Sequence, residues 1–298
     1  MPPPPFRPTS GCVTLALVAA DDRTKVLILG FGALGIALAR RHAARYAFRG
    51  VKRTPIASPP CPVFSLPIAD DGLVPHLAWA DHIVFCPAPA ASDPETYRAT
   101  YLDNMAAVTA RMAEHAIAPR SVILISSTGV YPESGDASID ETRDLVVETE
   151  RQDILVQTEH ALIDSGVPYV IFRCGGLYGE RRDAFRARLA EGRITTAMLS
   201  RQFVHFIHIN DVCDAIDLAI RLGIAGEIFN LVDDSPIRRV EFYRFLSALY
   251  GIPIPDGGPA PAVARDRVIS NAKVKSRLGL TLSSPRITDY LRASASAS

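Results

Sequence analysis

One glycine-rich segment, placed directly after a short apolar run, constrains the fold of this chain more than any other feature. The run is KVLIL at residues 25–29, and GFGALG at residues 30–35 follows it without a gap. From Ala33 to Arg45, apolar residues recur at helical spacing. A strand, a tight glycine turn and a helix in this order predict the first unit of a parallel α/β sheet.

The three glycines of this segment are spaced as dinucleotide binding requires. Gly30 permits the tight turn, Gly32 lets the backbone approach a pyrophosphate, and Gly35 lets the helix pack closely on the strand. The start of the helix adds N–H groups and a positive dipole end. The alternative is a tight turn that binds no ligand. The residues that we expect to contact the cofactor here are Gly30, Phe31, Gly32, Ala33, Leu34, Gly35 and Ala88.

The end of the second predicted strand favours one form of the cofactor. An NAD-specific site places Asp or Glu about 20 residues after the glycines, where it binds the ribose hydroxyls. Here the strand over 48–52 leads into Arg53 and Thr54, with no carboxylate. A guanidinium can pair bidentately with a 2′-phosphate. We therefore expect Arg53 to contact NADP in preference to NAD, and the alternative is a solvated basic strand end.

Further apolar runs alternate with helical patterns along the chain, at residues 82–86, 121–125 and 169–173. This alternation predicts a Rossmann-type, doubly wound parallel α/β sheet, covered by helices on both faces, with a smaller C-terminal substrate lobe. The division that we expect is a Pro-rich tail over 1–24, a dinucleotide-binding domain over 25–175, a substrate lobe over 176–292 whose segment 203–232 returns to the sheet, and a tail over 293–298.

Composition excludes several other classes of protein. The 32 Lys and Arg residues balance 32 Asp and Glu residues, which argues against nucleic acid or an anionic membrane as partner. No apolar window approaches the roughly 20 residues that span a bilayer. The five cysteines occur singly, as expected for reduced thiols of a cytoplasmic protein. His205 and His208 fall on opposite faces of a predicted strand, and Asp211 suits a helix N-cap, so no metal site is expected.

Four later segments, at residues 125–131, 173–179, 205–212 and 229–231, carry a further signal. In sequence and in order they resemble those of the extended short-chain dehydrogenase/reductases, in particular the NAD-dependent epimerase/dehydratase branch with its nucleoside-diphosphate-sugar epimerase-like members. The resemblance covers residues 25–292. It implies an NAD(P)-dependent oxidoreductase or epimerase/dehydratase that acts on a hydroxyl or carbonyl metabolite such as a nucleotide sugar, and a homodimer. The segments are ISSTGVY at 125–131, RCGGLYG at 173–179, HFIHINDV at 205–212 and FNL at 229–231.

The resemblance also shows a departure at the catalytic positions. It places Ser127 where the family binds the reacting oxygen, with Thr128 beside it. The family's Tyr-x-x-x-Lys pair falls on Arg151 and Leu155, and neither can exchange a proton near neutral pH. Tyr131 is then the expected replacement, although an unassisted phenol is a weak base there. Two alternatives stay open: strand-end hydroxyls that only cap the next turn, and a catalytically silent NADP(H) sensor.

Overall fold

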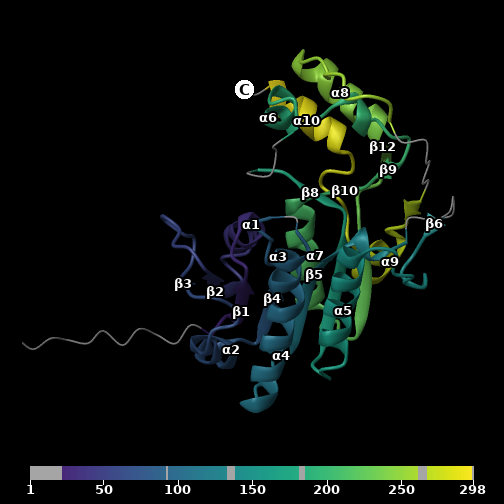
Figure 1. Cartoon of the computed structure of the whole chain (residues 1–298). Coiled ribbons are helices and arrows are strands. Elements are labelled where there is room, and N and C mark those ends of the chain that lie inside the picture. The colour runs from purple at the N-terminus through teal and green to yellow at the C-terminus, as the bar shows by residue number, and fades with distance from the viewer. Residues whose placement is uncertain (1–21, 92, 133–137, 181–184, 261–266, 297–298) are drawn as a thin grey trace, which may run out of the picture.

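Seven parallel strands form the central sheet of the computed structural model, which describes residues 22–91, 93–132, 138–180, 185–260 and 267–296 (Figure 1). The predicted Rossmann-type α/β fold is confirmed, since every neighbouring pair of strands in this sheet is parallel. In spatial order the strands are β11 (Glu227–Leu231), β7 (Tyr169–Cys174), β5 (Ser121–Ser127), β4 (His82–Phe85), β1 (Thr24–Leu29), β2 (Tyr46–Lys52) and β3 (Val63–Ser65).

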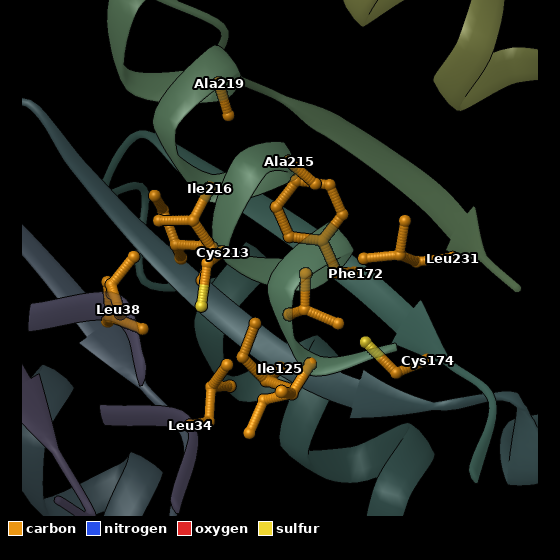
Figure 2. Packing of buried hydrophobic residues seen from close by; sticks show 14 of the residues in the cluster. Leu34, Leu38, Ile125, Phe172, Cys174, Cys213, Ala215, Ile216, Ala219 and Leu231 are labelled. Carbon is orange, nitrogen blue, oxygen red and sulfur yellow. The ribbon is translucent and has the colours of Figure 1, made fainter. Parts of the chain in front are cut away.

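Helices cover both faces of this sheet, so its strands are apolar on both sides. On β1, Val26 and Ile28 belong to one buried cluster, while Leu27 and Leu29 belong to the other. Figure 2 shows part of the first cluster, in which Leu34, Cys213 and Phe172 lie together. One face carries α1 (Ala33–Arg41), α7 (Ile209–Arg221) and α9 (Ala272–Leu278); the other carries α2 (Val74–Trp79), α4 (Asn104–Glu114) and α5 (Glu150–Ile163).

Two predicted helices differ from the observed ones. Helix α1 ends at Arg41 and not at Arg45, because the chain turns over His42 to begin β2. The sequence pattern over 93–115 predicts one helical stretch, and the structure there contains α3 (Pro94–Arg98), a π-helical turn η2 (Ala99–Asp103) and then α4. In η2 the hydroxyl of Thr100 donates to the carbonyl oxygen of Thr96 (2.7 Å). Such turns widen a helix locally and often occur at functional sites.

The smaller lobe lies beyond the carboxyl ends of the central strands (Figure 1). In its described residues it contains two short two-stranded sheets, three α-helices and a short 3₁₀ helix (Thr196–Met198), and a third pair of strands, β6 (Ser138–Ile139) with β13 (Val268–Ile269), lies beside it. The elements of the lobe are β8 (Gly176–Tyr178) paired with β10 (Phe206–His208), β9 (Phe203–Val204) paired with β12 (Ile237–Arg238), α6 (Phe185–Ala190), α8 (Arg239–Tyr250) and α10 (Ile287–Ser296).

The lobe corrects three expectations. Within the segment 203–232, β11 returns to the central sheet beside β7 as predicted, whereas residues 203–209 do not, because β10 pairs with β8 instead. The segment after Gly175, expected to be helical, begins with β8. The expected tail over 293–298 continues α10 as far as Ser296. The tail expected over 1–24 lies outside the described residues up to residue 21, and β1 already begins at Thr24.

Candidate functional site

The glycine turn has the geometry that the sequence predicts. Gly30 has φ +87°, and a Cβ there would lie 2.4 Å from the Cα of Pro87. Around Gly32 the nearest atom to such a Cβ is the Gly30 carbonyl oxygen at 3.8 Å, so this residue faces open space. At Gly35 a Cβ would lie 2.9 Å from the Phe31 ring. The first glycine therefore makes the turn, the second leaves room for a ligand and the third permits close packing.

A cavity of about 750 Å³ opens in front of this turn. Gly35 is not among its lining residues and acts through packing alone. The side chain of Phe31 is fully buried, and its amide donates to the carbonyl oxygen of Val51 (3.0 Å). The remaining predicted cofactor residues line the cavity together with the backbone of Phe31: Gly30, Gly32, Ala33, Leu34, Arg53 and Ala88.

One end of the cavity is basic. Lys52, Arg53 and Thr54 line it at the end of β2, and Arg53 is exposed and makes no hydrogen bond or ion pair with any described residue. Among the described lining residues, the one carboxylate is that of Glu95, which comes from α3 and not from β2. The strand end that positions the 2′-oxygen of a bound dinucleotide in Rossmann folds thus carries cations here.

Segments distant in sequence supply further walls of the cavity, which local sequence patterns do not predict. Because these residues reach the cavity only through strand order and helix packing, no local pattern marks them. The wall opposite the glycines includes the π-helical turn η2 and its flanks, and the short β3 segment adds an apolar rim. The missed residues include Leu66, Pro67, Ile68, Thr96, Thr100 and Asn104.

The hydroxyl-bearing turn after β5 lies outside the lining of this cavity. Ser127 is half-buried, and its Oγ accepts a hydrogen bond from the amide of Gly129 (3.0 Å), which caps the short helix η3 (Thr128–Val130). Thr128 is buried. Tyr131 is fully buried; its phenol donates to Asn230 Oδ1 (2.7 Å) and accepts from Arg173 Nη1 (3.0 Å). Burial raises the pKa of the Tyr131 phenol above its usual value.

The two departures from the family pattern lie on α5, facing this turn. Leu155 is buried in one cluster with Val130 and Tyr131. The Arg151 guanidinium lies over the ring of Tyr97, 4.6 Å from its centre. Neither side chain offers a proton that can be exchanged near neutral pH. The chemistry of an acid–base pair is therefore absent from these two positions.

A buried ion pair fixes α5 to the sheet. Arg173, on β7, donates from Nη2 to Glu159 Oε2 at 2.7 Å, and both side chains are at most 4% exposed. Ser126 Oγ donates to Glu159 Oε1 (2.6 Å). Burial lowers the pKa of Arg173, but the hydrogen bonds and charge of Glu159 outweigh it, so that pKa is raised. The pair joins β5, β7 and α5 directly below the hydroxyl-bearing turn.

The histidines and acid of the strand over 205–212 have structural partners. His205 Nε2 accepts from the amide of Ile269 (3.0 Å), and burial lowers the pKa of His205 to about 4. His208, and not the expected Asp211, is the N-cap of α7. Asp211 lies in the first helical turn, where its carboxylate accepts from the amide and hydroxyl of Ser283. In the described part of the chain, no three potential ligands gather as a metal site.

Comparison with known proteins agrees with this architecture. Protein YeeZ of Escherichia coli K12 is 26% identical over 276 residues, which cover 88% of this chain and 96% of YeeZ. The structure of Bacillus cereus UDP-glucuronic acid 4-epimerase, in complex with UDP-glucuronic acid and NAD, superposes with a TM-score of 0.76 at 17% identity and covers 92% of this chain and 98% of that one. Bordetella bronchiseptica WbmG, in complex with NAD and UDP, gives 0.75 at 19% identity, covering 94% and 96%.

The structural likenesses show the fold, and the sequence match decides the family. Within the described residues no helix has both the length and the apolar character to cross a bilayer. Residues 26–231, more than half of the chain, match the NAD dependent epimerase/dehydratase family. This match spans the glycine turn, the hydroxyl-bearing turn and the last strand of the central sheet. As the resemblance predicted, the chain belongs to the NAD-dependent epimerase/dehydratase family.

Proposed function

We propose that this protein binds NADP(H) in the cavity in front of the glycine turn and acts on a hydroxyl or carbonyl metabolite. The observation that carries the proposal is the open approach at Gly32, where a Cβ would have no neighbour closer than 3.8 Å, at the start of α1. A pyrophosphate fits there because the first-turn amides of a helix lack intrahelical partners. The volume of about 750 Å³ is in the range of cofactor sites.

The cations at the end of β2 support NADP over NAD. Arg53 has no competing partner among the described residues, so its guanidinium is available to a 2′-phosphate. Lys52 and Thr54 offer a second cation and a hydroxyl beside it. Glu95 is the counterargument, since a carboxylate repels a phosphate and binds ribose hydroxyls. Glu95 belongs to α3 and not to the strand end that contacts the ribose 2′-oxygen in Rossmann folds, so we rank it below the three residues of β2 and its turn.

Titration of both cofactors tests this proposal. Isothermal calorimetry would compare NADPH and NADH on the wild-type chain, on Arg53→Ala and on the control Arg40→Ala, whose exposed side chain lies at the end of α1. Loss of a charge-assisted bidentate pair costs about 1.5–3 kcal/mol, or roughly tenfold to a hundredfold in Kd. We expect that loss for NADPH in Arg53→Ala alone, with NADH unchanged. Equal NADPH affinity in all three chains would refute the Arg53 assignment.

The reaction class that we propose is oxidoreduction or epimerisation of a small substrate, such as the UDP-sugars bound by the relatives. A bound dinucleotide would supply hydride transfer. Ser127 and Thr128 would hydrogen-bond the reacting oxygen from the end of β5. A panel of nucleotide sugars and carbonyl compounds with NADPH tests this. Turnover that Ser127→Ala abolishes would support the enzyme, and turnover unchanged in that variant would contradict the role of Ser127.

A catalytically silent NADP(H) sensor is the second candidate, and the positions of Arg151 and Leu155 favour it. Leu155 fills the space beside the turn with an aliphatic group, and Arg151 is stacked on Tyr97. This candidate predicts cofactor binding without turnover in the wild-type chain. It also predicts that the double variant Arg151→Tyr, Leu155→Lys gains turnover on the same panel. Turnover by the wild-type chain would exclude the sensor.

Two further expectations belong to this proposal. The balanced charge and the single cysteines favour a cytoplasmic protein. A homodimer is expected from the family resemblance alone. Light scattering after size exclusion measures the mass in solution, and a single species at 32.3 kDa would contradict the dimer.

A further inference from the structure

Side chains from three separate segments hold the turn that follows Ser127. From α5, Gln152 Nε2 donates to the carbonyl oxygen of Val130 (2.9 Å). From the segment before β13, Arg267 Nη1 donates to the carbonyl oxygens of Tyr131 (2.6 Å) and Pro132 (3.1 Å). From β7, Arg173 reaches the Tyr131 phenol. Three residues far apart in the sequence thus converge on a few backbone groups and one phenol.

The phenol of Tyr131 joins Arg173 to a side chain of a further strand. It donates to Asn230 Oδ1 on the edge strand β11 and accepts from Arg173. The backbone of Asn230 is itself held, because its backbone N–H donates to Glu141 Oε1 (2.6 Å). Arg173 is held by its pairing with Glu159. The ring therefore ties β7, α5 and β11 to the end of β5.

The same contacts make Tyr131 a poor proton carrier. Its side chain is fully buried, whereas that of Ser127 is only half-buried. Both its donor and its acceptor capacities are already engaged, by Asn230 and Arg173. A general acid or base must come within hydrogen-bond reach of the proton that it transfers.

We propose that Tyr131 is a positioning residue, which holds the Ser127–Thr128 hydroxyls at the end of β5 through Arg173 and Asn230 and does not itself transfer a proton. The inference rests on the proposed function in one respect, namely that the hydroxyls of Ser127 and Thr128 contact the substrate. The hold on the turn is a property of the folded chain alone and can be measured without cofactor or substrate.

Two variants and one titration test this inference. Tyr131→Phe removes the phenol oxygen and keeps the ring, while Tyr243→Phe is the matched control, because Tyr243 is a buried tyrosine of α8 without a hydrogen bond to any described residue. Hydrogen–deuterium exchange would follow peptides over 121–132 and over 24–41. We expect at least tenfold faster exchange at the turn in Tyr131→Phe only, since two hydrogen bonds are lost, one of them to a charged group. Unchanged exchange over 121–132 would contradict the proposal that the Tyr131 phenol holds this turn.

The near-ultraviolet absorbance of tyrosinate separates positioning from proton transfer. The groups that face the Tyr131 phenol are Arg173, Asn230 and, at longer range, Glu141. The difference between the wild-type and Tyr131→Phe titrations reports this phenol alone. Positioning predicts no tyrosinate from Tyr131 below about pH 10, the ordinary value for a phenol. Tyrosinate forming between about pH 6 and 9 would overturn the assignment, because a working base titrates near the operating pH.

Activity and cofactor binding keep the two proposals apart. With any substrate from the panel, Tyr131→Phe should lower kcat at least tenfold, leave the KM for NADPH within twofold and keep the midpoints of the pH profile. A shifted midpoint would mean proton transfer. If NADPH fails to bind the wild-type chain, the proposed function falls, while the exchange and absorbance measurements still decide the role of Tyr131.

Discussion

Removing the charge of Glu159 should destabilise the fold more than any exposed ion-pair change. Glu159 accepts from Arg173 at 3.2, 3.2 and 2.7 Å and from Ser126 at 2.6 Å. The variant Glu159→Gln keeps the shape but leaves a buried guanidinium without its counter-charge. Breaking one side of such a pair costs about 3–5 kcal/mol. For a chain of 298 residues that corresponds to a fall in Tm of roughly 5–8 °C.

A double-mutant cycle tests whether the interaction itself, and not crowding, causes the loss. Arg173→Met should lower the free energy of unfolding by a similar amount, because Glu159 would then keep only the hydrogen bond from Ser126. The combined variant Glu159→Leu, Arg173→Met replaces both charges by apolar groups of similar size. The double variant should lose less free energy of unfolding than the single variants Glu159→Leu and Arg173→Met lose together. We expect the difference to be at least about 2 kcal/mol.

Urea unfolding measures these free energies. Far-ultraviolet circular dichroism and the fluorescence of Trp79, the single tryptophan, must give coincident transitions for the comparison to hold. The exposed pair of Arg292 and Asp289 is the control, and Asp289→Asn should change stability by less than about 1 kcal/mol. Additive single losses, within about 0.5 kcal/mol, would refute the argument that the buried pair is coupled.

Two further predictions concern the glycine turn and a buried acid. Gly30→Ala should cost about 3 kcal/mol or more and abolish cofactor binding, because φ is +87° and the new Cβ would lie 2.4 Å from the backbone of Pro87. Gly166→Ala, with φ +72° and nothing within 4 Å, should cost only about 1–2 kcal/mol, and equal losses in urea unfolding would contradict the steric argument. Burial raises the pKa of Asp233 to about 7. Because the unfolded value is about 3.9, the folded chain binds more protons between the two values, and stability should fall as pH rises from about 4 to 7. Asp233→Asn should remove that fall and leave the chain more stable than wild type above pH 7, by up to about 4 kcal/mol; parallel stability curves of the two chains against pH would contradict it.

Much of the candidate cofactor site could be predicted from local sequence, because backbone groups form its glycine turn. A turn residue with positive φ favours glycine, and the free donors at a helix N-terminus are simply its first backbone amides. Residues 30–35 therefore predict both features. The basic end of β2 was likewise visible, since Arg53 follows a short apolar strand. Its preference for NADP stays a prediction.

The positions that local patterns misplaced are those with weak or short signals. Residues 203–209 have an apolar strand pattern, but the pattern does not state which neighbour the strand pairs with, and β11 holds the sheet edge. The small residues after Arg292 suggested a tail, yet alanine and serine extend α10 once Leu291 packs in the lobe. β3 was hidden in a Pro-rich connection, because it has only three residues.

The role of Tyr131 shows where sequence reasoning stops for this chain. From its position four residues after Ser127, the phenol was expected at the mouth of the site. The fold buries it instead, between Arg173 on β7 and Asn230 on β11, which are 42 and 99 residues away along the chain. Strand order brings these partners together, and the spacing of residues within one segment cannot predict such contacts.

The amino-acid sequence by itself determined that the chain builds a parallel sheet with a tight glycine turn after its first strand, because φ preferences and apolar periodicity act over a few neighbouring residues. Only the tertiary structure decided which hydroxyls remain accessible, what lines the cavity and which charges are paired. Those properties depend on contacts between residues that the chain folds together from a distance, and burial, once set by those contacts, governs both hydrogen bonding and proton affinity.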